Sequence, residues 1–280
     1  MVEQILKVDE LPTAVAPRPA QFMPVGAGGD KRRIAFLRVP AGDEGANKPG
    51  ANKPGLVWLG GFKSDMRSTK ASALLAWAEE RGRAALALDY SGHGESSGTF
   101  EDGTIGRWFE EVLALFRAET KGPQIVLGSS MGGWIALLLA RALASLGETN
   151  RLHGLILIAP AVDFTQHMWE GFSADVRRTI ETQGKWLRPS QYSPEPYPIT
   201  RQLIEDGKSH LLLGGTIRTH APVHILQGMQ DPDVPWKRAT LLIEHLAGDP
   251  AVLTLVKDGD HRLSREEDLQ RLFAAIEAMD

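Results

Sequence analysis

The sequence predicts an α/β fold, in which a mostly parallel sheet is flanked by helices and carries a small cap insertion. Short apolar runs alternate with longer stretches of helical periodicity along the chain, as they do in βαβ units. No compositional break divides the 280 residues, so we expect a single domain over 1–280. One long interruption of the alternation, at about 163–215, predicts the cap.

The apolar runs are short and rich in Val, Ile and Leu, which favours strands. In chain order they occupy residues 33–39, 55–60, 84–90, 124–128, 154–159, 223–228 and 251–256. Helical patterns near 68–81, 104–119, 132–146 and 237–247 separate them, and an amphipathic stretch with a capping-box pattern of Ser264 and Glu267 closes the chain at 264–279.

The first two strands are joined by a loop and not by a helix, which indicates an antiparallel start to the sheet. This loop contains the tandem "GANKPGANKPG" at 45–55. Gly, Asn and Pro are typical of turns, so we interpret the tandem as a lengthened hairpin loop.

Composition excludes several classes of function. The net charge is −4, with 31 Lys and Arg against 35 Asp and Glu, which gives no basic surface for nucleic acid. Cysteine is absent, so disulfides and a cysteine nucleophile are ruled out. The apolar segment from Trp134 to Ala140 is too short to span a bilayer. The first residues carry Glu3, Asp9 and Glu10, unlike a signal or transit peptide, and we expect a cytoplasmic protein without integral membrane association.

A candidate nucleophile lies at the junction "GSSMG", residues 128–132. The pattern G-x-S-x-G centres on Ser130, with a strand-like run before it and a helical run after it. A sharp strand-to-helix turn crowds the positions two before and two after the serine, where only glycine fits. Ser129 has Leu127 and Met131 at those positions, so the spacing favours Ser130.

A serine hydroxyl needs a base, and that base needs a carboxylate to orient it. In doubly wound hydrolases the order is Ser, acid, His, each after a strand. Asp231 follows the run at 223–228 and His261 follows the run at 251–256, so we expect these two. Asp233 is the main rival for the acid and Asp163 a weaker one. The other histidines fit this placement less well: His93, His153, His167, His210, His220, His224 and His245.

Hydrolysis also needs donors for a tetrahedral oxyanion. We expect one from the Met131 N–H at the start of the helix, and the other from the Phe62 N–H after the glycine pair of "WLGGF". No cluster with metal-ligand spacing such as H-E-x-x-H is present, so neither a metal nor another cofactor is expected.

The motifs "LDYSGHGES", "GPQIVLGSSMGGW", "QGMQDPDVPW" and "DHRLS" resemble the α/β-hydrolase superfamily over essentially the whole chain. Within it they resemble the mitochondrial palmitoyl-protein thioesterase family, which also cleaves mycophenolic acid acyl-glucuronide. The resemblance implies Ser130, Asp231 and His261 as a triad in a cofactor-free esterase or thioesterase.

These observations favour a serine hydrolase that forms an acyl-enzyme on a small-molecule or lipid-acylated substrate. A peptidase on the same fold and a catalytically silent binding module are the alternatives. The cap contains Met168, Trp169, Phe172 and Trp186. These side chains either anchor the cap or line an acyl pocket, for which we name Trp134, Trp169, Trp186 and Trp236 as candidates.

Overall fold

A computed structural model describes residues 18–42, 50, 52–189, 195–246 and 248–280. Its centre is an eight-stranded sheet with the order β1-β2-β4-β3-β5-β6-β9-β10, in which β2 runs antiparallel to its neighbours β1 and β4 and all other neighbouring strands are parallel. The strands are β1 Gln21–Val25, β2 Arg32–Val39, β3 Gly55–Leu59, β4 Ala85–Leu88, β5 Gln124–Ser129, β6 Leu152–Ile158, β9 Val223–Gly228 and β10 Ala251–Val256.

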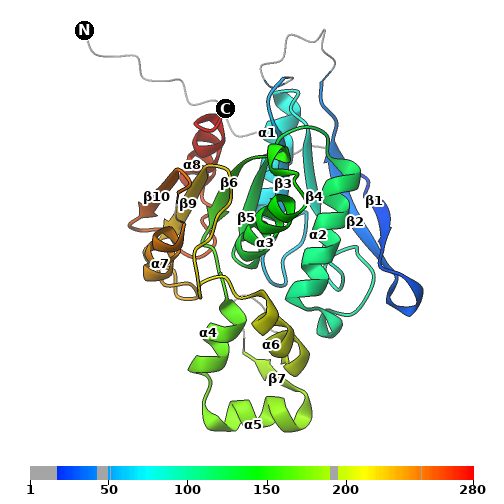
Figure 1. Ribbon diagram of the computed structural model, residues 1–280, viewed down its shortest axis with the longest axis vertical. Coiled ribbons are helices and arrows are strands. Elements are labelled where there is room, and N and C mark those ends of the chain that lie inside the picture. Colours follow the sequence, from blue (N-terminus) through cyan, green and yellow to red (C-terminus); the bar gives the residue numbers. More distant parts are fainter. Residues whose placement is uncertain (1–17, 43–49, 51, 190–194, 247) are drawn as a thin grey trace.

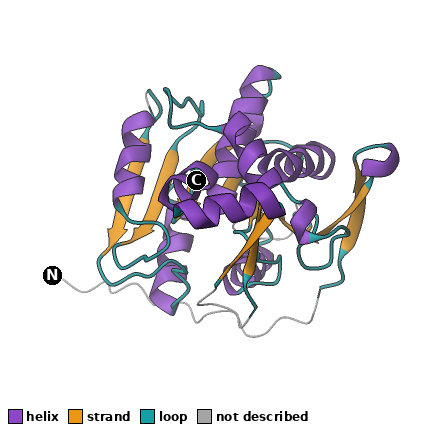
Figure 2. Ribbon diagram, turned by 90° about the horizontal axis from the view of Figure 1, so that it is seen from below, coloured by secondary structure: helices purple, strands orange, loops and turns teal. Residues whose placement is uncertain are grey.

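Helices cover both faces of the sheet (Figures 1 and 2). One face packs against α1 (Thr69–Glu80) and α8 (Glu266–Glu277). The other packs against α2 (Ile105–Glu119), α3 (Met131–Ser145) and α7 (Lys237–His245). Strand β3 is buried along its whole length, as expected for a central strand with both faces covered. Short 3₁₀ turns occur at Gly28–Asp30, Phe100–Asp102, Thr149–Arg151 and Lys208–His210.

The seven expected strands and five expected helices are all present, but the start of the sheet differs from the prediction. Strand β2 pairs with β1 and β4, whereas β3 lies between β4 and β5. The first two expected strands are therefore antiparallel without being neighbours, and the hairpin interpretation is wrong. Most of the "GANKPG" tandem lies outside the described residues.

The last helix also begins later than expected. Its first residue is Glu266, and the acidic side chain at its start is Asp268, which accepts a hydrogen bond from the Arg265 N–H at 3.2 Å. The pattern of Ser264 and Glu267 therefore does not form the capping box.

The cap lies between β6 and β9, at the carboxyl ends of the parallel strands (Figure 1). It comprises α4 (Phe164–Gly171), α5 (Ala174–Gln183), the antiparallel pair β7 (Lys185–Arg188) and β8 (Tyr197–Thr200), and α6 (Arg201–Gly207). The carboxylate of Asp163 accepts hydrogen bonds from the N–H groups of Leu212 and Leu213 at 2.8–3.1 Å. This buried contact holds the two ends of the cap together.

Within the described ranges, no helix is both long and apolar enough to cross a membrane.

Candidate active site

Ser130 occupies the turn between β5 and α3 with φ 54° and ψ −117°. This conformation is unusual for a non-glycine residue and marks a strained turn. Its two flanking glycines make the turn possible. A Cβ on Gly128 would lie 2.4 Å from the Gly132 carbonyl oxygen, and a Cβ on Gly132 would lie 2.1 Å from that of Leu59. The glycine spacing thus has the steric cause that the sequence indicated.

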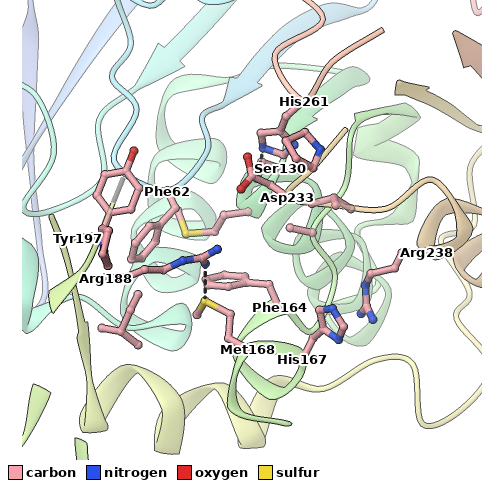
Figure 3. A pocket seen from close by; sticks show the side chains of 16 residues that line it. Phe62, Ser130, Phe164, His167, Met168, Arg188, Tyr197, Asp233, Arg238 and His261 are labelled. Carbon is pink, nitrogen blue, oxygen red and sulfur yellow. Dashed lines mark hydrogen bonds between the residues drawn. The ribbon is translucent and has the colours of Figure 1, made fainter. Parts of the chain in front are cut away.

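His261 lies in the loop after β10, next to Ser130 (Figure 3), and its ring contacts both Ser130 and Asp231. Its Nε2 is 3.1 Å from Ser130 Oγ, and its Nδ1 is 2.7 Å from Asp231 Oδ2. Both distances are within hydrogen-bond range. The structure therefore brings together the three side chains that were expected as nucleophile, base and acid.

The Asp231 carboxylate is fully enclosed by donors. Oδ1 accepts the N–H groups of Asp233 and Val234, both at 2.8 Å, and Oδ2 accepts Gln227 Nε2 at 3.1 Å as well as His261. Its side chain is 0% exposed. These hydrogen bonds fix the orientation of the carboxylate toward the imidazole.

The rival acids have other positions. Asp233 lines the cavity above Ser130, while its N–H helps to hold Asp231. Asp163 binds the cap as described above, and burial raises the pKa of its carboxyl. Most of the other histidines have partners elsewhere: His153 contacts the Met279 carbonyl, His224 contacts Thr254, and His245 contacts the Gly215 carbonyl.

The two residues expected to supply oxyanion donors, Phe62 and Met131, line the same cavity as Ser130. A Cβ on Gly61 would be 3.2 Å from Ser130 Cβ, so the loop after β3 passes close to the nucleophile. Among the hydrogen bonds of the described residues, neither the Phe62 N–H nor the Met131 N–H has an acceptor. Both N–H groups therefore stay candidates for the oxyanion donors.

His93 has a role that the sequence did not reveal. Its Nε2 accepts the Lys63 N–H at 3.1 Å, and its Nδ1 contacts the Ser91 carbonyl oxygen at 3.2 Å. Lys63 has φ 58°, so this contact holds a strained residue directly after Phe62. The side chain is buried, and burial lowers the pKa of His93 to about 4. A neutral His93 is thus positioned to order the loop that contains Phe62.

The low pKa of His93 predicts an effect on stability. The unfolded chain binds a proton here below pH 6.5, whereas the folded chain does so only near pH 4. The contribution of this group to folding stability is therefore fully present above pH 6.5 and decreases as the pH falls toward 4. As the pH falls through this range, we expect the Tm of the His93→Gln variant to decrease less steeply than the Tm of the unmodified protein. The same dependence of Tm on pH in both proteins would contradict the low pKa of His93.

One group of acidic and histidine side chains in the described ranges is compact enough for a metal: Asp231, Asp233 and His261, with ligand atoms within 4.8 Å of one another. However, both Asp231 oxygens already accept hydrogen bonds, and Nδ1 of His261 contacts one of them. A metal here would have to displace the contact between Asp231 and His261, so the donor set suits a histidine base better.

A cavity of about 650 Å³ opens above Ser130 and His261. The four tryptophans named as pocket candidates are not among the residues that line it. Trp134 is buried and donates to the His210 carbonyl oxygen. Trp169 and Trp186 pack inside the cap, and Trp236 precedes α7. The apolar walls of the cavity come instead from Phe62, Phe164, Met168, Tyr197, Ile199 and Val234.

Comparisons with known proteins agree with this architecture. The family model described as "Serine aminopeptidase, S33" matches residues 56–231, a range that includes Ser130 and Asp231. The chain belongs to the α/β-hydrolase family. At the level of this family, the chain is a serine hydrolase that resembles esterases.

Individual relatives extend the match to nearly the whole chain. The mouse mitochondrial palmitoyl-protein thioesterase ABHD10 is 33% identical over 224 residues, covering 80% of this α/β-hydrolase and 74% of the relative. A hydrolase structure from Agrobacterium vitis S4 is 45% identical with a TM-score of 0.88, covering 94% of this chain and 99% of that one. The mouse ABHD10 structure has a TM-score of 0.81 at 29% identity, covering 93% and 98%.

Proposed function

We propose that the protein hydrolyses carboxylic esters or thioesters through an acyl-enzyme on Ser130. Ser130 Oγ attacks the substrate carbonyl while His261 Nε2 takes the hydroxyl proton, and the N–H groups of Phe62 and Met131 bind the oxyanion. His261 returns the proton to the leaving alcohol or thiol. Water then attacks the acyl-enzyme with the same base, which releases the acid and restores Ser130.

The observation that carries this proposal is the chain of contacts from Ser130 through His261 to Asp231, at 3.1 Å and 2.7 Å. Phe62 and Met131, whose N–H groups have no acceptor among the described residues, line the same cavity as this serine. Attack on a carbonyl needs a nucleophile, a base, an orienting acid and oxyanion donors, and these residues provide all four.

For the substrate, we propose an acyl group that occupies the cavity beside Ser130. The cavity volume and its aromatic and aliphatic walls suit a chain of several methylenes. The ABHD10 relatives are palmitoyl-protein thioesterases, an activity that is compatible with such a chain. Acyl-glucuronide esters and acylated proteins are the substrate classes we propose to test first.

The acyl cavity predicts a dependence on chain length. Each buried methylene contributes about 0.8 kcal/mol, or roughly fourfold in kcat/KM if the contact is made in the transition state. We expect kcat/KM to rise from acetyl to octanoyl 4-nitrophenyl esters. The Phe164→Ala variant should flatten this rise more than it lowers acetyl turnover, because Phe164 lines the cavity.

Leu187→Ala is the matched control, since Leu187 is an apolar cap residue that is 52% exposed and does not line the cavity. Its chain-length profile should equal that of the unmodified protein. If kcat/KM of the unmodified protein is highest for the acetyl ester, the proposal of an acyl pocket is contradicted. An esterase for small acyl groups would then be the better assignment.

A peptidase on the same fold is the second candidate, because the matching family model is described as a serine aminopeptidase. An aminopeptidase must bind a substrate ammonium group, for which a carboxylate is needed. Among the described residues that line the cavity, the charged side chains are the cations Arg188 and Arg238 and one acid, Asp233. This charge distribution favours esters without a free amine, and turnover of amino-acyl 4-nitroanilides above that of octanoyl esters would reverse the choice.

A further inference from the structure

Arg188 places a guanidinium in the cavity that contains the nucleophile. It is the last residue of β7, where burial alternates so that Trp186 and Arg188 face inward and Lys185 and Leu187 face outward. Figure 3 shows its side chain extending between Phe62 and Phe164 toward Met168. The residue is half-buried, so its position is part of the cavity and not of the outer surface.

Within the described part of the chain, this guanidinium has no anionic partner. Its one contact is a hydrogen bond from Nη1 to Met168 Sδ at 3.4 Å, and a thioether is a weak acceptor. It forms no described ion pair and does not stack on a described aromatic ring. The sequence of residues 190–194, SQYSP, contains no acid. Most of the donor capacity of Arg188 is therefore unused.

The other polar groups of the cavity differ from Arg188 in their contacts or in their charge. Arg238 donates to the Val162 carbonyl oxygen at 2.8 Å and lies near the carboxylates of Asp163 and Glu170. Burial, together with Arg238, lowers the pKa of His167, so that imidazole is neutral at pH 7. Asp233 lies beside His261 (Figure 3). Arg188 is thus a charge that no described anion compensates, and the described side chains nearest to it, Phe62, Phe164 and Met168, are apolar (Figure 3).

A guanidinium in such surroundings loses hydration without gaining an anion, which is unfavourable unless a ligand supplies one. Its planar fork of donors matches carboxylates and phosphates. Building on the proposed hydrolase function, we propose that the substrates are esters or thioesters that carry an anionic group, carboxylate or phosphate, and that Arg188 binds this group during turnover. Arg188 is then a specificity residue that acts on the substrate away from the scissile bond.

The test uses two pairs of substrates, because the anion can belong to either side of the ester. The first pair varies the acyl side: mono-4-nitrophenyl suberate, with a terminal carboxylate, against 4-nitrophenyl octanoate. The second varies the leaving group: 4-carboxyphenyl octanoate against 4-carbamoylphenyl octanoate. Each ester is assayed with the unmodified protein, Arg188→Gln, Arg188→Lys and the control Arg178→Gln, which removes an exposed cap charge outside the cavity.

We expect Arg188→Gln to lower kcat/KM for the anionic member of one pair by about 10- to 100-fold, the range for a lost hydrogen bond to a charged group. The neutral members should change less than threefold, Arg188→Lys should retain part of the preference, and Arg178→Gln should behave as the unmodified protein. Equal losses on anionic and neutral members of both pairs would show a structural role and overturn the proposal.

A binding measurement separates this proposal from the proposed function. In a Ser130→Ala background, calorimetry should give tighter binding of monomethyl suberate than of dimethyl suberate, and Arg188→Gln should remove the difference. If the unmodified protein hydrolyses none of the four esters but this difference is present, the hydrolase assignment fails while the anion site stands. If neither readout depends on Arg188, the anion site is wrong.

Discussion

Ser130→Ala is expected to abolish ester turnover, with a loss in kcat on the order of 10⁶. The variant removes the only hydroxyl that contacts His261 Nε2 among the described residues, while the strained backbone and both flanking glycines stay in place. The fold should be unaffected, and an unchanged Tm together with lost activity is the measurement that checks this. A residual activity within tenfold of that of the unmodified protein would show that Ser130 is not the nucleophile.

Ser129→Ala is the matched control for this change. Ser129 is the last residue of β5, is 8% exposed, and makes no described contact to His261. Because only a buried hydroxyl is lost, most of the activity should remain. A loss comparable to that of Ser130→Ala, in a folded protein, would reverse the choice between the two serines.

Asp231→Asn is expected to lower kcat on the order of 10⁴-fold. The N–H groups of Asp233 and Val234 both donate to Oδ1, so the amide oxygen of an asparagine would remain there. Its NH₂ group would then face His261 Nδ1 and favour the tautomer that carries its proton on Nε2. Such an imidazole cannot accept the proton of Ser130.

Asp233→Asn tests the rival acid with the same chemical change. The carboxylate that contacts His261 Nδ1 is that of Asp231, and Asp233 supplies its backbone N–H, which the substitution preserves. We expect less than a tenfold change in kcat. Equal or reversed effects of the two variants would show that the other carboxylate orients the base.

Most of the fold was predictable because the parallel strands are continuous apolar runs between amphipathic helices. Strand β1 was missed because its sequence, "QFMPV", is short, contains Pro24 and is mostly exposed. It is an edge strand, where proline is tolerated. The neighbour of β2 was predicted wrongly for a different reason. The order of the strands depends on the insertion of β4 between β2 and β3, which no local sequence pattern encodes.

The candidate triad was predictable because each member follows a strand, and the carboxyl ends of parallel strands share one edge of the sheet. The function of His93 was not predictable in this way. Its importance arises from a contact to a backbone N–H thirty residues earlier, at Lys63. A residue that acts through the backbone of a distant loop leaves no spacing pattern in the sequence.

The cavity walls were predicted least well. Large size and apolarity suggested the tryptophans of the cap, but Trp186 packs against Phe172 with ring centroids 5.3 Å apart. These rings form the interior of the cap, whereas Phe164 and Met168 on α4 face the site. Arg188 faces the site through strand alternation in a four-residue strand, which is too short for a reliable pattern in the sequence.

Fluorophosphonate labelling with mass spectrometry is the direct test of Ser130 as a nucleophile that His261 activates. Trypsin is expected to release residues 122–141, which contain both Ser129 and Ser130, and fragmentation between them locates the adduct. We expect one adduct, on Ser130, that is lost in His261→Ala. An adduct on Ser129, or a folded protein that does not react, would contradict it.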